Sequence, residues 1–97
     1  MAKAFKSVLF NNLAMIYRAK IEVSLKPGHT DPEGNTVQRL LKELGYSVDV
    51  VNVSKTYNIQ IQAVDKEEAQ AKSEEMAKRL LANPTKDNYF ISVEEQK

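Results

Sequence analysis

The stretch Leu25–Leu40, which reads LKPGHTDPEGNTVQRL, decides the fold because it ends a strand and begins a helix. Pro27 has a fixed φ and no backbone N–H, so it cannot extend a strand ladder, and Gly28 tolerates a positive φ. Asp31 is a favoured helix N-cap residue, and Pro32 suits the first helical position. This stretch therefore predicts a strand, a tight turn and a capped helix.

Apolar residues on either side of this turn show which surfaces are buried. In the preceding strand, every second residue is apolar: Tyr17, Ala19, Ile21, Val23 and Leu25. In the helix, an apolar stripe follows the spacing i, i+3, i+4 and i+7 through Val37, Leu40, Leu41 and Leu44. Gly45 ends this helix. The two patterns predict a helix packed on the apolar face of a sheet.

The next extended segment is unusually long. Its apolar face reads Val51, Val53, Tyr57, Ile59, Ile61 and Ala63, and only Lys55 interrupts the series. The odd-even parity is unbroken and no glycine is present, which argues against a two-residue hairpin turn at Ser54–Lys55. We predict one long, bent strand. A three-residue loop over 54–56 would also keep the parity and would give a ferredoxin-like hairpin.

A second helix and a last strand complete the chain. Asp65 caps the helix, and Glu68 stands three residues later, as in a capping box. The predicted buried stripe of this helix is Ala69, Met76, Ala77, Leu80 and Leu81. Asn83-Pro84 ends it, and Tyr89, Ile91 and Val93 alternate with polar residues in the last strand.

The predicted fold is α+β, a two-layer β-α-β-α-β arrangement related to the ferredoxin-like fold, with a long bent central strand and both helices on one sheet face. A single domain spans 15–97, and the extension 1–14 has apolar residues at helical spacing. The other sheet face is polar and the sheet edges are open, which predicts a homo-oligomer, a dimer or a tetramer.

Composition excludes several classes of function. The 97 residues carry a formal charge of +1, so nucleic acid is not the expected partner. Cysteine is absent, which excludes disulfides and thiol nucleophiles and fits a reducing, cytoplasmic location. No apolar run reaches the roughly 18 residues that a membrane span needs.

The residues give little sign of catalysis or of a ligand. His29 is the only histidine and is interpreted as a turn residue, since no second metal ligand stands at a recognisable spacing. Glu67-Glu68 and Glu74-Glu75 are interpreted as a solvated helix face. Phe90 is the one aromatic ring predicted to face outward, which is too few for stacking RNA bases. A small-molecule-binding regulatory module of the ACT type has similar topology and stays open as the alternative.

Taken together, the motifs resemble the PurS family, the small subunit of phosphoribosylformylglycinamidine synthase. The resemblance rests on Lys26-Pro27-Gly28, on Asp31-Pro32-Glu33-Gly34 and on Leu81-Ala82-Asn83-Pro84, and it covers nearly all of 15–95. Lys55 matches a family segment that commonly reads Val-x-Val-Gly-Lys, whereas Ser54 departs from it. His29-Thr30 and Thr85-Lys86 replace apolar pairs of the family.

The resemblance implies a non-catalytic assembly subunit in purine biosynthesis. The synthase converts formylglycinamide ribonucleotide, ATP and glutamine into formylglycinamidine ribonucleotide. A large ligase subunit binds ATP and magnesium, and a glutaminase subunit releases ammonia. This chain is then expected to bind no cofactor or metal, to bridge the two catalytic subunits and to aid ammonia transfer. The residues expected to contact partners are Lys26, Pro27, Gly28, Asp31, Pro32, Gly34 and Lys55.

Overall fold

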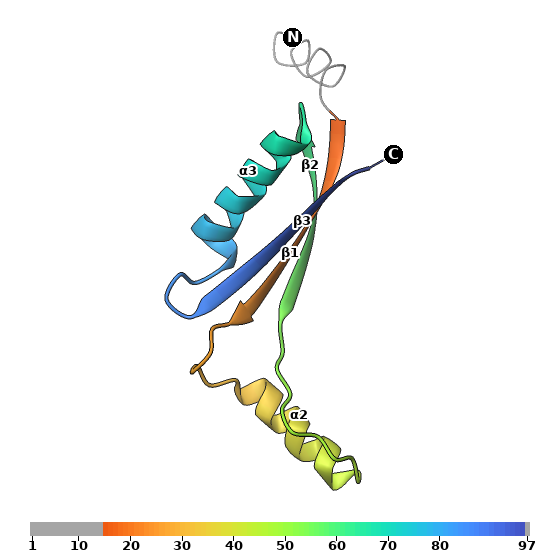
Figure 1. Ribbon diagram of the computed structural model, residues 1–97, viewed down its shortest axis with the longest axis vertical. Coiled ribbons are helices and arrows are strands. Elements are labelled where there is room, and N and C mark those ends of the chain that lie inside the picture. The colour runs from red at the N-terminus through yellow and green to blue at the C-terminus, as the bar shows by residue number, and fades with distance from the viewer. Residues whose placement is uncertain (1–14, 97) are drawn as a thin grey trace, which may run out of the picture.

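A computed structural model of the chain describes residues 15–96 and consists of three strands and two helices (Figure 1). In chain order these are β1 (Met15–Leu25), α2 (Pro32–Glu43), β2 (Lys55–Ala63), α3 (Lys66–Met76) and β3 (Asp87–Glu95). One wide helical turn, η1 (Ala77–Leu81), extends α3. The N-terminal extension 1–14 lies outside the described residues.

The three strands form one antiparallel sheet with the order β2-β1-β3. β1 is therefore the central strand, with Ile21 opposite Tyr57 of β2 and Ile91 of β3. Because β2 and β3 both run antiparallel to β1, they are parallel to each other and are joined by a crossover through α3. The α+β class, the three-stranded sheet and the two helices agree with the prediction.

The core lies between the sheet and α3. The buried sheet residues are the predicted apolar ones, among them Ala19, Ile21 and Val93, and they meet Ala69 and Ala77 from the helix. Small alanines let the helix approach the sheet closely. Leu80 was predicted to be buried, but 82% of its surface is exposed, because the wide turn at η1 directs it away from the sheet.

The position of α2 differs from the prediction. The helix forms with the predicted boundaries but does not cover the sheet. It lies beyond the end where β1 stops, and it makes no extensive contact with the sheet or with α3 (Figure 1). The prediction of two helices on one sheet face is thus wrong for α2. Sequence periodicity shows which face of a helix is apolar but does not show what covers that face.

The segment after α2 replaces the sheet as the neighbour of this helix. Gln38 donates through its side chain to the carbonyl oxygen of Asp49, and the first turn of α2 lies against the backbone of Val51. α2 and residues 46–53 together form a small lobe, which we call the helix lobe.

The long bent central strand is also corrected. Only Lys55–Ala63 pairs in the sheet, where it forms an edge, and residues 51–54 are extended without sheet pairing. Val53 donates its backbone N–H to Asp31 instead of to a neighbouring strand. The structure has no hairpin at 54–56, so the alternative with four strands is excluded as well.

None of the helices within 15–96 is long and apolar enough to cross a membrane.

Candidate partner-binding site

Two loops meet where the sheet ends, and together they hold most of the predicted partner-binding residues. The first loop runs from Lys26 to Asp31, and the second from Asn83 to Lys86. Lys26 joins them twice: its backbone N–H donates to the carbonyl oxygen of Lys86 at 2.7 Å, and its Nζ donates to that of Pro84 at 2.9 Å. We call these two loops, held together by Lys26, the loop junction. It brings together two motifs that are far apart in the sequence.

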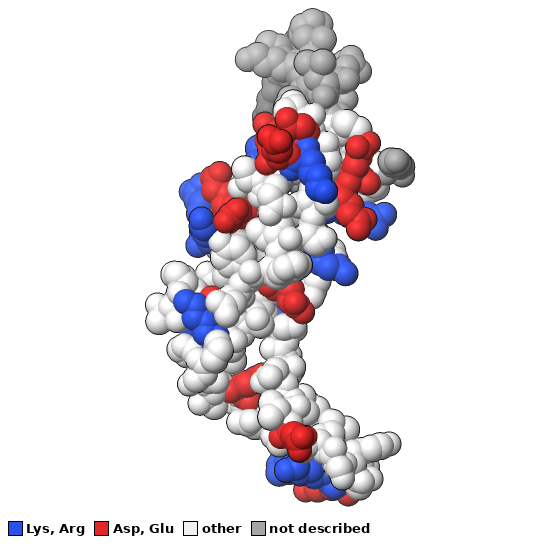
Figure 2. Space-filling model, in the orientation of Figure 1, with Lys and Arg blue, Asp and Glu red and all other residues white. Residues whose placement is uncertain are grey.

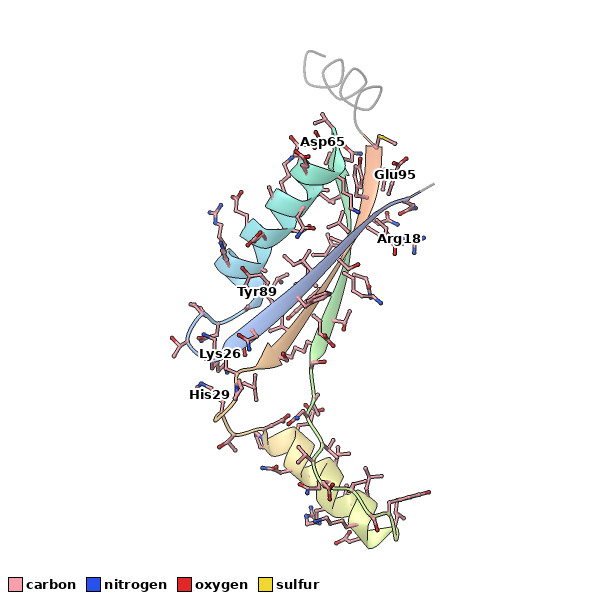
Figure 3. The ribbon with its side chains drawn as sticks, in the orientation of Figure 1. Arg18, Lys26, His29, Asp65, Tyr89 and Glu95 are labelled. Carbon is pink, nitrogen blue, oxygen red and sulfur yellow. The ribbon has the colours of Figure 1, made fainter. Side chains whose placement is uncertain are left out.

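The turn in the first loop forms as predicted. Gly28 has φ +91°, a conformation that glycine adopts without strain, and His29 donates its backbone N–H to the carbonyl oxygen of Lys26 at 3.3 Å. His29 is exposed in this turn, and it lies with Lys26 at the junction of sheet and helix lobe (Figure 3).

Asp31 links the sheet to the helix lobe. One carboxylate oxygen accepts the N–H of Gly34 at 2.9 Å and caps α2, and the other accepts the N–H of Val53 at 2.8 Å. These two bonds favour the charged carboxylate, so the hydrogen bonds from Val53 and then Gly34 lower the pKa of Asp31 below its usual value. The predicted cap is confirmed, and the bond to Val53 fixes the returning chain as well.

The second loop is fixed by Asn83. Its side-chain oxygen accepts the N–H groups of Thr85 and Lys86, at 2.8 and 3.3 Å, and its own N–H donates to Asp87 at 2.8 Å. Asn83-Pro84 was predicted only as a helix stop. The contact between this loop and Lys26 was not predicted, because nothing in the spacing of the two motifs indicates that they meet.

Two hollows flank the loop junction. The first has a volume of about 480 Å³ and is lined by Lys26, Pro27, Gly28 and Asp31 from the prediction, together with neighbours such as Ser54. The second has a volume of about 200 Å³; Asp31 and Lys55 line it, with Tyr57 and Lys86. Residues 52–54 also line the first hollow, although they were predicted to be part of a paired strand. Of the remaining predicted residues, Pro32 and Gly34 lie in the first turn of α2.

Acidic and basic side chains line both hollows. Within residues 15–96, no group of three or more histidine, aspartate or glutamate side chains could hold a metal ion. Three glutamates of α3, Glu68, Glu74 and Glu75, form ion pairs one turn apart with Lys72, Lys78 and Arg79, in agreement with the predicted solvated charged face. Figure 2 shows charges of both signs dispersed over the visible face of the described residues, without a large basic area.

Comparison with known proteins identifies relatives of the whole domain. Residues 18–95 match the sequence profile of the family PurS, described as phosphoribosylformylglycinamidine (FGAM) synthase. The chain is 40% identical over 80 residues to the phosphoribosylformylglycinamidine synthase subunit PurS of Methanocaldococcus jannaschii, an alignment that covers 81% of this chain and 96% of that protein.

Solved structures of PurS chains have the same fold as this chain. The fold matches Thermus thermophilus PurS with a TM-score of 0.78 at 36% identity, over 84% of this chain and 99% of that one. It also matches a chain in the structure of PurLQS from Thermotoga maritima, with a TM-score of 0.73 at 28% identity, over 84% of this chain and 98% of that one.

Proposed function

The chain belongs to the PurS family of FGAM synthase subunits, and we propose that it is the subunit that bridges the ligase and glutaminase subunits of that enzyme. It takes part in purine biosynthesis as a non-catalytic subunit of a ligase complex. The observation that carries the proposal is the match over nearly the full length of a PurS chain, including one in the PurLQS structure.

The division of chemistry within the complex is part of the proposal. ATP, magnesium and glutamine are assigned to the partner subunits, and this chain is assigned no cofactor. Support comes from its residues: the sequence has no cysteine that could act as the glutaminase nucleophile. A rigid bridge would hold the two catalytic subunits close together, so that ammonia passes between them with little loss to water. We assign this assembly to the cytoplasm, which the absence of cysteine favours.

We propose the loop junction and Lys55 as the surface that contacts the catalytic subunits. Six of the seven predicted residues lie on the loop from Lys26 to Asp31 or in the first turn of α2 directly after it. Lys26 donates one hydrogen bond here, and the side chains of Asp31 and Asn83 accept others, so this region is held in one conformation. A preordered loop loses little conformational entropy when a partner binds.

Complex formation tests the proposal. The chain is mixed with the ligase and glutaminase subunits, magnesium nucleotide and glutamine, and the mixture is separated by size-exclusion chromatography. We expect all three polypeptides to elute together, and the two catalytic subunits to elute separately without this chain. If the chain elutes alone in every mixture, the proposal is wrong.

A pair of lysine variants tests the surface. Lys55→Ala removes an exposed cation beside the loop junction, and Lys66→Ala removes an exposed cation from the first turn of α3, next to the opposite end of the sheet. We expect only Lys55→Ala to weaken co-elution. If both variants co-elute with the catalytic subunits to the same extent, Lys55 is not part of the proposed surface.

The ACT-type alternative makes a different prediction. A small-molecule module would show saturable thermal stabilisation by an amino acid or nucleotide in the absence of partner subunits. We expect no such shift for this chain, and nothing in its relatives favours that class.

A further inference from the structure

Lys26 and Lys86 both belong to the loop junction, but their side chains have different surroundings. Lys26 is half-buried, and its Nζ donates to the carbonyl oxygen of Pro84 at 2.9 Å. Lys86 is exposed and joins the loops through its backbone. Its carbonyl oxygen accepts the N–H of Lys26 at 2.7 Å, and its own N–H donates to the backbone and side-chain oxygens of Asn83, both at 3.3 Å. The fold thus fixes the backbone of Lys86 and leaves its side chain exposed.

A second exposed lysine lies beside Lys86. Lys55, at the start of β2, and Lys86 line the same hollow of about 200 Å³. Among residues 15–96, ion pairs occur only along α2 and along α3 with its extension η1. Neither lysine therefore has an acidic partner in this part of the chain. The fold brings two unpaired cations from distant segments to one place.

Three carboxylates also line this hollow, and two of them are already engaged. Asp31 accepts two backbone N–H groups, and Asp87 accepts one. The third is Glu33, in the first turn of α2. Of the charged side chains at the hollow, two lysines and one carboxylate thus lack a partner among the described residues. This balance favours a binding partner that brings negative charge.

We propose that Lys86 and Lys55 together bind an acidic side chain of a catalytic subunit, and that Lys26 is a positioning residue that holds the loop of Lys86 for this contact. Lys26 was predicted to contact partners itself, and here it acts through the second loop. A fixed loop keeps Lys86 beside Lys55 and reduces the conformational entropy that is lost on binding. The contact rests on the proposed function, since a catalytic subunit supplies the carboxylate.

Hydrogen exchange tests the role of Lys26 in the chain alone. Lys26→Met keeps the backbone N–H and an apolar stem, and it removes the donor to Pro84. By NMR, we expect the protection factors of the Thr85 and Lys86 amides to fall about two- to tenfold, the effect of losing one hydrogen bond. Lys86→Ala should leave the protection of Thr85 unchanged. Unchanged protection in Lys26→Met would overturn the positioning role.

A double-mutant cycle tests how the two lysines act on binding. Dissociation constants are measured for the natural chain, Lys26→Met, Lys86→Ala and the double variant, with the ligase and glutaminase subunits, magnesium nucleotide and glutamine. We expect each single variant to weaken binding by about three- to fivefold. Because Lys26 acts through Lys86, the double variant should bind no more weakly than the weaker single variant. A double effect equal to the product of the single effects would overturn the indirect role.

Charge reversal tests the acidic partner. Lys86→Ala and Lys86→Glu keep the backbone bonds of this residue, so they change the contact without removing a bond between the loops. We expect Lys86→Glu to bind more weakly than Lys86→Ala, and Lys86→Ala to depend less on added sodium chloride than the natural chain does. The matched pair Lys66→Ala and Lys66→Glu, next to the opposite end of the sheet, should bind as the natural chain does.

The contact and the proposed function can fail separately. If the natural chain forms no complex with the catalytic subunits, the proposed function is wrong, and this contact with it. If the natural chain binds but Lys86→Glu binds as strongly as Lys86→Ala, only the acidic contact is wrong.

Discussion

Gly34 lies where the first turn of α2 comes closest to the returning chain. A Cβ atom at this position would lie 2.2 Å from the carbonyl oxygen of Val51, much closer than atoms can approach. The glycine is therefore required by a close approach and not by its backbone angles. The sequence motif Asp31-Pro32-Glu33-Gly34 marked this residue as a partner contact, whereas the structure also gives it a role in packing.

Gly34→Ala tests this role through the sign of its effect. In an open helix, alanine is more favourable than glycine by about 1 kcal/mol. Here we expect destabilisation by about 1–3 kcal/mol, because the backbone of Val51 must move. Urea unfolding measures the difference, with Asn35→Ala at the exposed next position as the control. A more stable Gly34→Ala protein would contradict the described packing.

Asp31 makes the stability of the chain dependent on pH. Its pKa is lowered in the folded state by hydrogen bonds from Val53 and Gly34. The stabilisation is thus fully present above the unfolded pKa of about 3.9 and is lost as the pH falls through the lower folded pKa. We expect Asp31→Ala to have a lower urea midpoint than the natural chain at pH 7. Below pH 4, we expect the difference between the two midpoints to become smaller.

The control for this experiment is Asp49→Ala, which removes an exposed carboxylate from the same lobe. At pH 7, its urea midpoint should differ less from that of the natural chain than the midpoint of Asp31→Ala does. If the difference in urea midpoint between Asp31→Ala and the natural chain stays constant from pH 7 to pH 3, the carboxylate charge contributes nothing to stability.

At the scale of elements, β1 is the strand on which the fold depends. It pairs on both sides, and Ile21 at its centre is completely buried in a cluster with Ala77 of η1. The alternation of Tyr17, Ala19, Ile21 and Val23 was enough to predict which face is buried, because every second residue of a strand points to the same face of the sheet. The sequence did not reveal that β1 is central, since strand order depends on contacts between distant residues.

Ile21→Ala and Ile16→Ala compare the two faces of this strand. The first creates a cavity in the core, and we expect it to cost about 2–5 kcal/mol of the free energy of unfolding. The second truncates a side chain that is 42% exposed and should cost under about 1 kcal/mol. Equal losses, measured by urea unfolding, would mean that the buried face is wrongly assigned.

The helices show where sequence patterns stop being informative. The boundaries of α2 were predictable because Asp31, Pro32 and Gly45 act locally. Gly45 has φ +97°, and the N–H groups of Gly45 and Tyr46 close the helix on Lys42 and Leu41. What covers Leu40 and Leu44 was not predictable, because an apolar stripe is compatible with its own sheet or with that of another molecule.

At the scale of the whole molecule, the chain consists of a sheet covered by α3 and a projecting helix lobe, joined by the loop junction (Figure 1). This shape suits an assembly subunit, since the helix lobe and the loop junction expose separate surfaces. The candidate site was predicted in part: the resemblance supplied Lys26–Gly34, but the contact between Lys26 and Pro84 required the fold. When two loops far apart in the sequence form one surface, the spacing of their motifs seldom predicts that they meet.

The most direct test of the central claim compares two ammonia sources in one assay. FGAM formation is measured for the ligase and glutaminase subunits, with and without this chain, first with glutamine and then with ammonium salt. A bridging subunit predicts that glutamine-dependent formation requires this chain, whereas ammonium-dependent formation by the ligase subunit requires it far less. Glutamine-dependent formation at the same rate without the chain would contradict the account.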